Sequence, residues 1–188
     1  FQFLISNFQF LMNICFFNST KSWGGGEKWH FDMSNRILKS EFKPLIITNK
    51  QSELFKRAKL SGIKSIEIKI TNLSFLNIFK LIKVINIFKK NELLYIIINH
   101  PADLKIAGLA AKIAGIKNII YRRGSAIPIK NSFLNRFYFR KIVTHIIANS
   151  EETKRTINAN NTNLFPQKKI EIIYNGLDLQ KFDNLEST

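Results

Sequence analysis

Cysteine and histidine are scarce in this 188-residue sequence, and each shortage excludes a kind of site. The single cysteine, Cys15, excludes an intramolecular disulfide and any metal site built from several thiolates, and a reducing compartment is the simplest expectation. The three histidines (His30, His100 and His145) are scattered, with no pair at the i,i+4 spacing of helical metal ligands. We therefore expect no metal site.

Long apolar runs are also lacking. Residues 1–17 carry no charge, but glutamine, serine and asparagine interrupt them, whereas a membrane-spanning helix needs about 20 predominantly apolar residues. No basic segment or small-residue cleavage site typical of a secretory signal is found. Because residue 1 is not methionine and a strand pattern directly follows Met12, we expect residues 1–11 to be a non-native extension upstream of Met12.

Acidic residues are few: 13 face 29 lysines and arginines, which gives a formal net charge of +16. Such an excess favours an anionic partner, either nucleic acid, anionic lipid or a phosphorylated substrate. The whole sequence is rich in lysine, asparagine and isoleucine, so a drift in composition explains part of the excess, and the charge gives weak support only. The 45% of hydrophobic residues suffices for a buried core.

Short apolar runs alternate with helical patterns along the chain. Strands are expected at 14–17, 45–48, 66–70, 94–98, 119–121, 145–148 and 170–174. Helices are expected at 27–40, 52–61, 74–90, 103–114, 132–143 and 151–158. Most strand runs are apolar throughout, as in parallel strands covered on both faces. This alternation predicts an α/β, Rossmann-like, doubly wound and mainly parallel sheet with helices on both faces.

Polar residues follow the expected strands, at the edge where an open parallel sheet binds ligands. Six runs are followed by asparagine, and the fifth leads into Arg122 and Arg123; the asparagines are Asn18, Asn49, Asn72, Asn99, Asn149 and Asn175. Asparagine also favours turns and helix caps, which we prefer as the explanation for Asn49 and Asn72. Two adjacent arginines that leave a buried strand point to opposite faces, so at least one should reach the crevice and suit a phosphate or carboxylate. Arg122 and Arg123 are therefore the best candidates for binding an acceptor. An ion pair with Asp103 or Glu151 is the alternative.

Three consecutive glycines, Gly24, Gly25 and Gly26, lie between the first strand and the first helix. Glycine lets the backbone approach a ligand closely and allows a positive φ, and a helix N-terminus there presents free N–H groups to an anion. The run matches neither G-x-G-x-x-G, since residue 29 is tryptophan, nor a G-K-[ST] phosphate loop, so nicotinamide cofactors and ATP hydrolysis are not expected. A flexible turn is the plain alternative.

Four segments in this order resemble the N-terminal domain of family 4 glycosyltransferases of the GT-B fold. They are N-S-T-K-S-W-G-G-G-E-K at 18–28, A-A-K-I-A-G-I-K-N-I-I-Y-R-R-G at 110–124, I-I-A-N-S-E-E-T-K at 146–154 and I-I-Y-N-G-L-D-L-Q-K-F at 172–182. The resemblance assigns residues 12–178 to that domain and 179–188 to the start of a linker. It implies a retaining, metal-independent enzyme whose second, donor-binding domain lies beyond this sequence, with a nucleotide-sugar as co-substrate and no other cofactor.

The resemblance also implies roles for individual residues. Gly24, Gly25 and Gly26 would close on the donor diphosphate. Glu27 and Lys28 match the acceptor side of the pattern, although both also suit the first turn of a helix. Asn149, Ser150 and Glu151 would line the cleft while also reading as a strand end and helix cap. Asn175 and Gly176 would line it near the hinge.

His100 and the segment 74–90 each leave two interpretations open. His100 follows the fourth strand, where an imidazole could transfer a proton to or from the reacting sugar or acceptor, or could merely satisfy the backbone of the loop before Pro101 and a cap at Asp103. Polar residues of 74–90 step by three, so they wind around a helix. Such a helix could wedge against the sheet or contact an anionic membrane surface.

The preferred hypothesis is therefore the N-terminal half of a glycosyltransferase. It would add a sugar to a glycan or lipid-linked acceptor in cell-surface polysaccharide or lipopolysaccharide synthesis, in the cytoplasm or at the inner face of the plasma membrane. The 188 residues alone should be inactive, and no nucleic acid partner is expected. One alternative is a basic nucleic-acid-binding module, motivated by the basic-aromatic segment 136–141. The other is an inactive truncated fragment.

Overall fold

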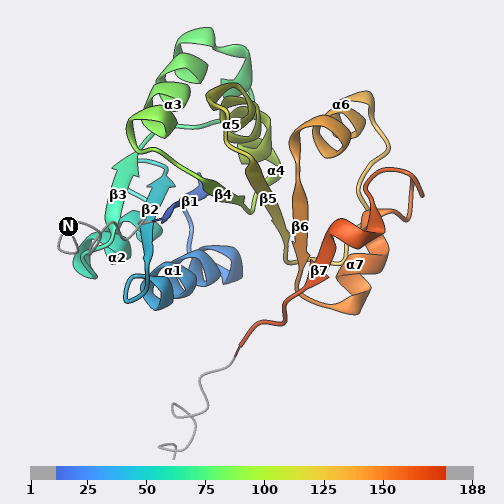
Figure 1. Cartoon of the computed structure of the whole chain (residues 1–188), viewed down its shortest axis with the longest axis horizontal. Coiled ribbons are helices and arrows are strands. Elements are labelled where there is room, and N and C mark those ends of the chain that lie inside the picture. The colour runs from blue at the N-terminus through green and yellow to red at the C-terminus, as the bar shows by residue number, and fades with distance from the viewer. Residues whose placement is uncertain (1–11, 177–188) are drawn as a thin grey trace, which may run out of the picture.

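A seven-stranded parallel sheet forms the centre of the computed structural model, which describes residues 12–176 (Figure 1). The expected extension at 1–11 and linker at 179–188 lie outside these residues. The strands are β1 (Met12–Asn18), β2 (Phe42–Thr48), β3 (Lys64–Glu67), β4 (Tyr95–Ile98), β5 (Asn118–Arg123), β6 (His145–Ala148) and β7 (Ile170–Ile172). All seven expected strands are present, and the predicted Rossmann-like α/β fold is confirmed.

The strand order β3-β2-β1-β4-β5-β6-β7 creates one topological switch point, between β1 and β4. The chain runs outward from β1 to β3 and then returns to continue on the other side of β1. Connections on the two sides of this point leave toward opposite faces of the sheet, which opens a crevice at the carboxyl ends of the strands. Phe17 of β1 pairs with Ile98 of β4, and Ile98 pairs with Tyr121 of β5, so the ends of these three strands lie side by side.

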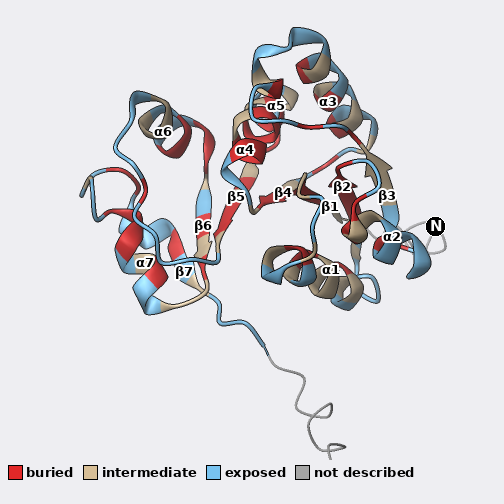
Figure 2. Ribbon diagram, turned by 180° about the vertical axis from the view of Figure 1, so that it is seen from behind, coloured by how far each residue is buried: buried red, intermediate tan, exposed pale blue. Residues whose placement is uncertain are grey.

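Alternation along β1 explains how the sheet is covered on both faces. Ile14 and Phe16 belong to one core cluster, while Cys15 and Phe17 belong to the other. β1 therefore buries successive side chains in opposite layers, as expected for a parallel strand between helices. Buried residues accordingly concentrate along the strands and the inner sides of the helices (Figure 2).

Helices flank the sheet on both sides (Figure 1). The α-helices are α1 (Gly25–Ile37), α2 (Glu53–Leu60), α3 (Ile78–Lys90), α4 (Pro101–Asp103), α5 (Leu109–Ala114), α6 (Phe133–Phe137) and α7 (Glu151–Ile157). Two π-helical segments, η2 (Leu104–Gly108) and η3 (Tyr138–Ile142), continue α4 and α6, and two short 3₁₀ turns are η1 (Ser74–Leu76) and η4 (Gln167–Lys169).

The segment 74–90 is not one helix. Asn77 ends η1 and its side chain accepts a hydrogen bond from the Lys80 N–H, which starts α3. One side of α3 packs into the core through Leu81, Val84 and Phe88, so the helix wedges against the sheet as one of the two interpretations had it. No helix within residues 12–176 is long and apolar enough to cross a membrane.

Candidate functional site

Residues from four separate segments meet at the carboxyl ends of β4 and β5 around a hollow of about 340 Å³. Its lining consists of Gly25, Gly26, Asn99, Arg122, Gly124, Ser125 and Asn175. Four of these residues were predicted to be site residues: Gly25, Gly26, Arg122 and Asn175. We refer to this hollow as the Arg122 pocket. It lies beside the switch point between β1 and β4, where this topology places ligands.

The glycine run forms the N-terminus of α1 at one wall of the Arg122 pocket. Gly24 is the N-cap in an extended conformation, with φ −151° and no side chain to cap the helix, so the first N–H groups of α1 are free of a capping oxygen. Gly26 lies so close to β4 that a Cβ on it would meet Asn99 Nδ2 at 2.0 Å, whereas a Cβ on Gly25 would meet no protein atom within 4 Å. A side chain at position 26 would therefore displace the Asn99 amide.

None of the three glycines of this run uses the positive φ that glycine permits. Within residues 12–176, the glycines with positive φ are Gly62 and Gly115. The glycine run therefore serves close packing and an open helix N-terminus rather than a left-handed turn.

Arg122 is the charged residue at the base of the pocket, and only 3% of its surface is exposed. Its Nη1 donates to Asn99 Oδ1 at 3.1 Å, and its Nη2 donates to Asn175 Oδ1 at 2.9 Å. The guanidinium also lies over the ring of Trp29, 4.6 Å from the centroid. Burial lowers the pKa of Arg122 from its ordinary value, opposed by the nearby charge of Glu27. Both hydrogen-bond partners are neutral amides, so the cation remains available to an anionic ligand.

Arg123 lies on the opposite face of β5 and does not reach this pocket. Its Nη2 donates to the backbone carbonyls of Ser125 and Ile127, which holds the loop that follows β5. Neither arginine is ion-paired with Asp103 or Glu151 in the structure. The alternation of a strand thus separates the two arginines as expected, and Arg122 is the one in the crevice.

Glu27 and Lys28 occupy different environments although they are adjacent. Glu27 is buried and accepts a 2.8 Å hydrogen bond from Asn18 Nδ2, which ties the first turn of α1 to the end of β1. Lys28 is exposed and pairs with Asp32 one turn further along the helix. Neither lines the Arg122 pocket. Glu27 positions the glycine run, and Lys28 lies on the outer surface of α1.

Asp103, which we expected to be a helix cap, is a buried carboxylate that lies close to the loop after β1. Its Oδ2 accepts a 2.9 Å hydrogen bond from the Ser19 N–H, and its Oδ1 has no partner among the described residues. Burial raises the pKa of Asp103 to about 6; the Ser19 hydrogen bonds and the positive potential of His100 oppose the rise, and Glu27 adds to it. Asp103 thus fixes the start of the loop that carries the glycine run.

His100 takes the capping position that we expected Asp103 to fill. Its Nδ1 accepts a 3.4 Å hydrogen bond from the Ala102 N–H at the start of α4, and the side chain is exposed. It does not line the Arg122 pocket. The preceding residue, Asn99, contacts Arg122 instead. The sequence offered one indication of this role, because Asn99 is one of the asparagines that directly follow a strand.

The segment Asn149, Ser150 and Glu151 acts locally at the start of α7. Ser150 Oγ accepts from the Thr153 N–H, and Asn149 Nδ2 donates to the Gly124 carbonyl at 3.2 Å. Asn149 therefore supports the rim of the Arg122 pocket from behind, whereas the exposed Glu151 lies away from it, in a shallow hollow with Gln167. Gly176 follows Asn175 near Arg36 of α1.

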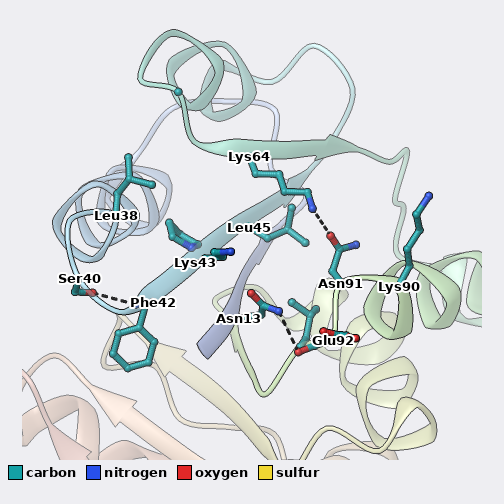
Figure 3. A pocket seen from close by; sticks show the side chains of 13 residues that line it. Asn13, Leu38, Ser40, Phe42, Lys43, Leu45, Lys64, Lys90, Asn91 and Glu92 are labelled. Atoms are coloured by element: carbon teal, nitrogen blue, oxygen red, sulfur yellow. Dashed lines mark hydrogen bonds between the residues drawn. The ribbon is translucent and has the colours of Figure 1, made fainter. Parts of the chain in front are cut away.

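Another hollow, of about 540 Å³, lies at the opposite end of the sheet (Figure 3). Lys43, Lys64 and Lys90 are among the residues around it, and Lys64 Nζ donates to Asn91 Oδ1 at 2.7 Å. It is located at the amino ends of β1, β2 and β3, so it shares no residue with the Arg122 pocket.

The basic-aromatic segment 136–141 does not present a stacking surface for bases. Tyr138 and Phe139 are each only 4% exposed and pack into the core, while Phe137 remains partly exposed. Stacking on nucleobases requires accessible aromatic faces. The structure therefore removes the main motif behind the nucleic-acid-binding alternative.

Comparison with known proteins gives one family and several structural relatives. The sequence matches Glycosyltransferase Family 4 over residues 23–181. No curated protein matches it. Similar solved structures include a glycosyltransferase from Rickettsia africae, with 20% identity, a TM-score of 0.74 and coverage of 94% of this chain and 46% of that one.

Two further similar structures are those of a protein in complex with UDP-glucose and of a galactosyltransferase. Anabaena Alr3699/HepE in complex with UDP-glucose has 18% identity and a TM-score of 0.72, over 90% of this chain and 45% of that one. The lipopolysaccharide outer core galactosyltransferase WaaB has 18% identity and a TM-score of 0.64, over 89% of this chain and 47% of that one. The chain spans slightly less than half the length of each of these structures.

The family match covers most of the chain and includes the glycine run, Arg122 and Asn175, the same residues that meet in the pocket. The parallel sheet with its switch point agrees with the fold of the structural relatives. The chain belongs to Glycosyltransferase Family 4, and it has the architecture predicted for the N-terminal domain of an enzyme of the GT-B fold.

Proposed function

We propose that this domain forms the acceptor-side half of a retaining, metal-independent glycosyltransferase that uses a nucleotide-sugar. The observation that carries the proposal is the Arg122 pocket. The open N-terminus of α1, at Gly25 and Gly26, and the buried cation of Arg122 face one hollow at the switch point of the sheet. Backbone N–H groups at a helix N-terminus and a guanidinium both favour an anionic group.

The chemistry assigned to these residues is binding and orientation. A diphosphate leaving from the transferred sugar carries developing negative charge, and fixed donors stabilise it more in the transition state than in the substrate. The glycine run would approach the diphosphate of a donor held by the second domain, and UDP in the structure of the Anabaena relative makes a uridine nucleotide the first donor to test. Asn99, Arg122 and Asn175 would contact the acceptor or the transferred sugar.

The acceptor is proposed to be a glycan or lipid-linked molecule of cell-surface polysaccharide or lipopolysaccharide synthesis, reached from the cytoplasmic face of the membrane. Support comes from an exposed apolar surface on η1 and the first turns of α3. It consists of Leu73, Leu76, Ile78, Phe79 and Ile82. Phe79 is 81% exposed, and no acidic residue occurs between Glu67 and Glu92, while several lysines do. Apolar and basic side chains together suit an anionic lipid surface.

Transfer assays test the proposal. The chain should be expressed alone and joined to the donor-binding domain of its full-length gene product, each with radiolabelled UDP-sugars and a membrane-derived acceptor fraction. We expect transfer by the joined protein only, because the groups that bind the donor lie in the second domain. Turnover by the isolated 188 residues, or a joined protein that hydrolyses or epimerises the donor without transfer to any acceptor, would contradict the proposal.

A further inference from the structure

A separate hollow of about 230 Å³ lies on the other side of the β5 end from the Arg122 pocket. It is bounded by the start of η2, the end of β5, the loop at 128–130 and the helix formed by α6 and η3. We refer to it as the Arg123 pocket. Both π-helical segments contribute to its wall, through Leu104 of η2 and Tyr138 of η3. Such local widenings of a helix often occur at functional sites.

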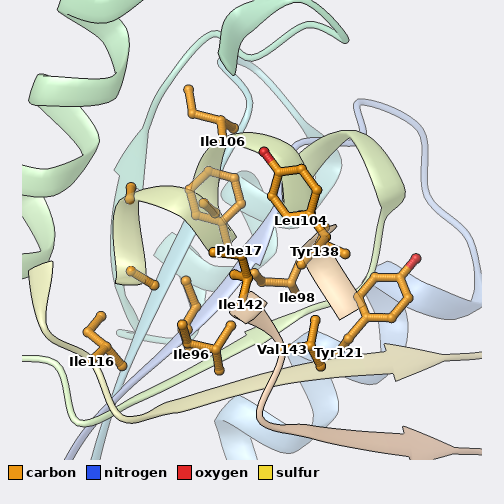
Figure 4. Packing of buried hydrophobic residues seen from close by; sticks show 14 of the residues in the cluster. Phe17, Ile96, Ile98, Leu104, Ile106, Ile116, Tyr121, Tyr138, Ile142 and Val143 are labelled. Carbon is orange, nitrogen blue, oxygen red and sulfur yellow. The ribbon is translucent and has the colours of Figure 1, made fainter. Parts of the chain in front are cut away.

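The wall of the Arg123 pocket is mainly apolar. It includes Leu104, Tyr121, Ile129, Leu134, Tyr138 and Phe139. The Tyr138 hydroxyl donates to the Lys105 carbonyl at 2.6 Å, and the ring of Tyr121 packs edge-on against Phe139 at 5.5 Å between centroids. Tyr121 and Tyr138 belong to the same buried hydrophobic cluster as Leu104 and Phe17 (Figure 4). The rings and aliphatic groups therefore form a surface that suits a hydrocarbon.

Three basic side chains and no acidic side chain lie beside this apolar wall. Lys105, Arg123 and Lys130 line the pocket, and its lining contains no aspartate or glutamate. The Nε of Arg123 is enclosed and has no hydrogen-bond partner within residues 12–176. A ligand with an apolar part and one negative group would therefore find complementary surroundings here, since an enclosed cation gains from an anionic partner.

The size and position of the pocket indicate that it would hold only one part of a longer ligand. Its volume is below the roughly 300–1,000 Å³ of pockets that enclose a drug-sized molecule. The loop after β5 connects it to the Arg122 pocket, because Gly124 and Ser125 line one and Ile129 and Lys130 line the other. Arg123 holds this loop through the carbonyls of Ser125 and Ile127. A molecule that follows the loop would extend from one pocket to the other.

We infer that the Arg123 pocket binds the lipid anchor of the acceptor, with an apolar chain segment against its wall and the adjoining phosphate at Arg123, Lys105 and Lys130. The inference rests on the proposed function in one respect, that the acceptor is lipid-linked. It places the glycan end of the acceptor along the loop at 124–127, toward Arg122. In this arrangement Arg122 lies at the reacting end of the acceptor and Arg123 lies at its lipid anchor.

Photo-crosslinking to the 188-residue chain tests the inference without any donor sugar. The probe is decyl phosphate with a diazirine on its chain, used below the concentration at which it forms micelles. We expect labelled peptides from residues 101–105 and 128–139. The matching decanol probe should label these peptides about tenfold less, because it lacks the charge-assisted hydrogen bonds of the phosphate.

Three variants test whether the labelling depends on the Arg123 pocket. Leu134→Trp should fill the pocket and abolish labelling there, and Arg123→Gln should weaken it by about ten- to a hundredfold. Lys141→Gln removes an exposed charge of the same helix outside the pocket and should leave labelling unchanged. Circular dichroism of each variant verifies folding, and Leu134→Trp remains informative if Arg123→Gln does not fold.

Several outcomes would overturn the inference. These are labelling confined to η1 and α3, equal labelling by the alcohol probe, or labelling that survives Leu134→Trp. The first would indicate a bilayer surface rather than an anchor site. Labelling in the pocket combined with a joined protein that transfers no sugar would instead leave the lipid site intact and contradict the proposed function, so the two failures can be distinguished.

Discussion

Gly26 and Asn99 lie so close together that a Cβ on the glycine would be 2.0 Å from the amide nitrogen of the asparagine. The same amide group accepts a hydrogen bond from Arg122 through its Oδ1. A contact between α1 and the end of β4 is thereby linked to the cation at the end of β5. The glycine run, for which a ligand loop and a flexible turn were the two interpretations, is thus also part of the packing that holds Arg122.

Gly26→Ala tests this linkage. The new methyl group would displace the Asn99 amide and with it one of the two hydrogen bonds of Arg122, so we expect sugar transfer by the full-length enzyme to fall by about tenfold or more. The thermal midpoint should also fall, since the clash lies inside the fold. Steady-state kinetics and thermal unfolding measure the two effects.

Gly25→Val is the matched comparison. No protein atom lies within 4 Å of a Cβ at this position, so we expect the melting temperature to stay within a degree or two, while the side chain enters the Arg122 pocket and blocks transfer. Equal activity of Gly25→Val and the unmodified enzyme would show that no ligand approaches the helix N-terminus. Equal activity of Gly26→Ala would show that Asn99 can move without consequence.

Much of the fold was predictable because burial on both faces leaves a continuous apolar run for most of the strands. The prediction was least accurate for β3, expected at 66–70 but found at Lys64–Glu67. Ile68 and Ile70 are buried in the core although they follow the strand. An apolar pattern records which side chains are buried, not which backbone groups form the ladder, so it cannot distinguish a strand from an extended loop that packs on the core.

The site was predictable only in part. Alternation along a strand required that Arg122 and Arg123 diverge, but the pattern could not indicate which of them faces the switch point. That choice depends on the register of β5 against β4, which places Tyr121 beside Ile98 and so Arg122 next to Asn99. The environments of Asp103 and Glu27 depend on contacts with Ser19 and Asn18, formed only when the loop after β1 folds over them. No local pattern encodes such contacts.

Arg122→Ala should reduce kcat/KM of the full-length enzyme by about ten- to a hundredfold, because an enclosed charge-assisted contact is lost. Stability should fall as well, since Asn99 and Asn175 lose their donor. With a water-soluble acceptor that carries no lipid, Arg123→Ala should retain most of the activity because its side chain lies outside the Arg122 pocket. Comparable losses for both variants with that acceptor would contradict the assignment of Arg122 alone to the reacting end.

Asp103→Asn tests the buried carboxylate through the pH dependence of stability. The pKa of Asp103 is raised from 3.8 to about 6 by burial, so the folded chain holds this proton more tightly than the unfolded chain does. Between about pH 4 and 6, this group therefore lowers the free energy of unfolding as pH rises. We expect the stability of Asp103→Asn relative to the unmodified chain to increase over this range, by about 1–3 kcal/mol.

Urea unfolding at pH 4, 5, 6 and 7 measures the effect of Asp103→Asn. Asp32→Asn is the control, because Asp32 is an exposed carboxylate paired with Lys28 on the surface of α1. A stability difference between Asp103→Asn and the unmodified chain that is constant from pH 4 to 7 would show that Asp103 is ionised normally in the folded state.

The buried His30 should make the free energy of unfolding depend on pH in the opposite direction from Asp103. It is fully buried beside Phe16 and Trp29, and neither ring nitrogen has a hydrogen-bond partner within residues 12–176. Burial lowers the pKa of His30 to about 3, and the charge of Arg122 adds to the decrease. The unfolded chain binds this proton below about pH 6.5 and the folded chain does not, so stability is lost as pH falls from 6.5 toward 3.

His30→Phe should remove this loss and also the cost of two unsatisfied nitrogens, so we expect the free energy of unfolding to rise by about 1–3 kcal/mol at pH 7. The gain should widen further between pH 6.5 and 4. His30→Leu serves the same purpose if the larger ring does not fit. A His30 variant that is less stable at pH 7 and keeps the slope of the unmodified chain would show that His30 is a hydrogen-bonded, titrating residue.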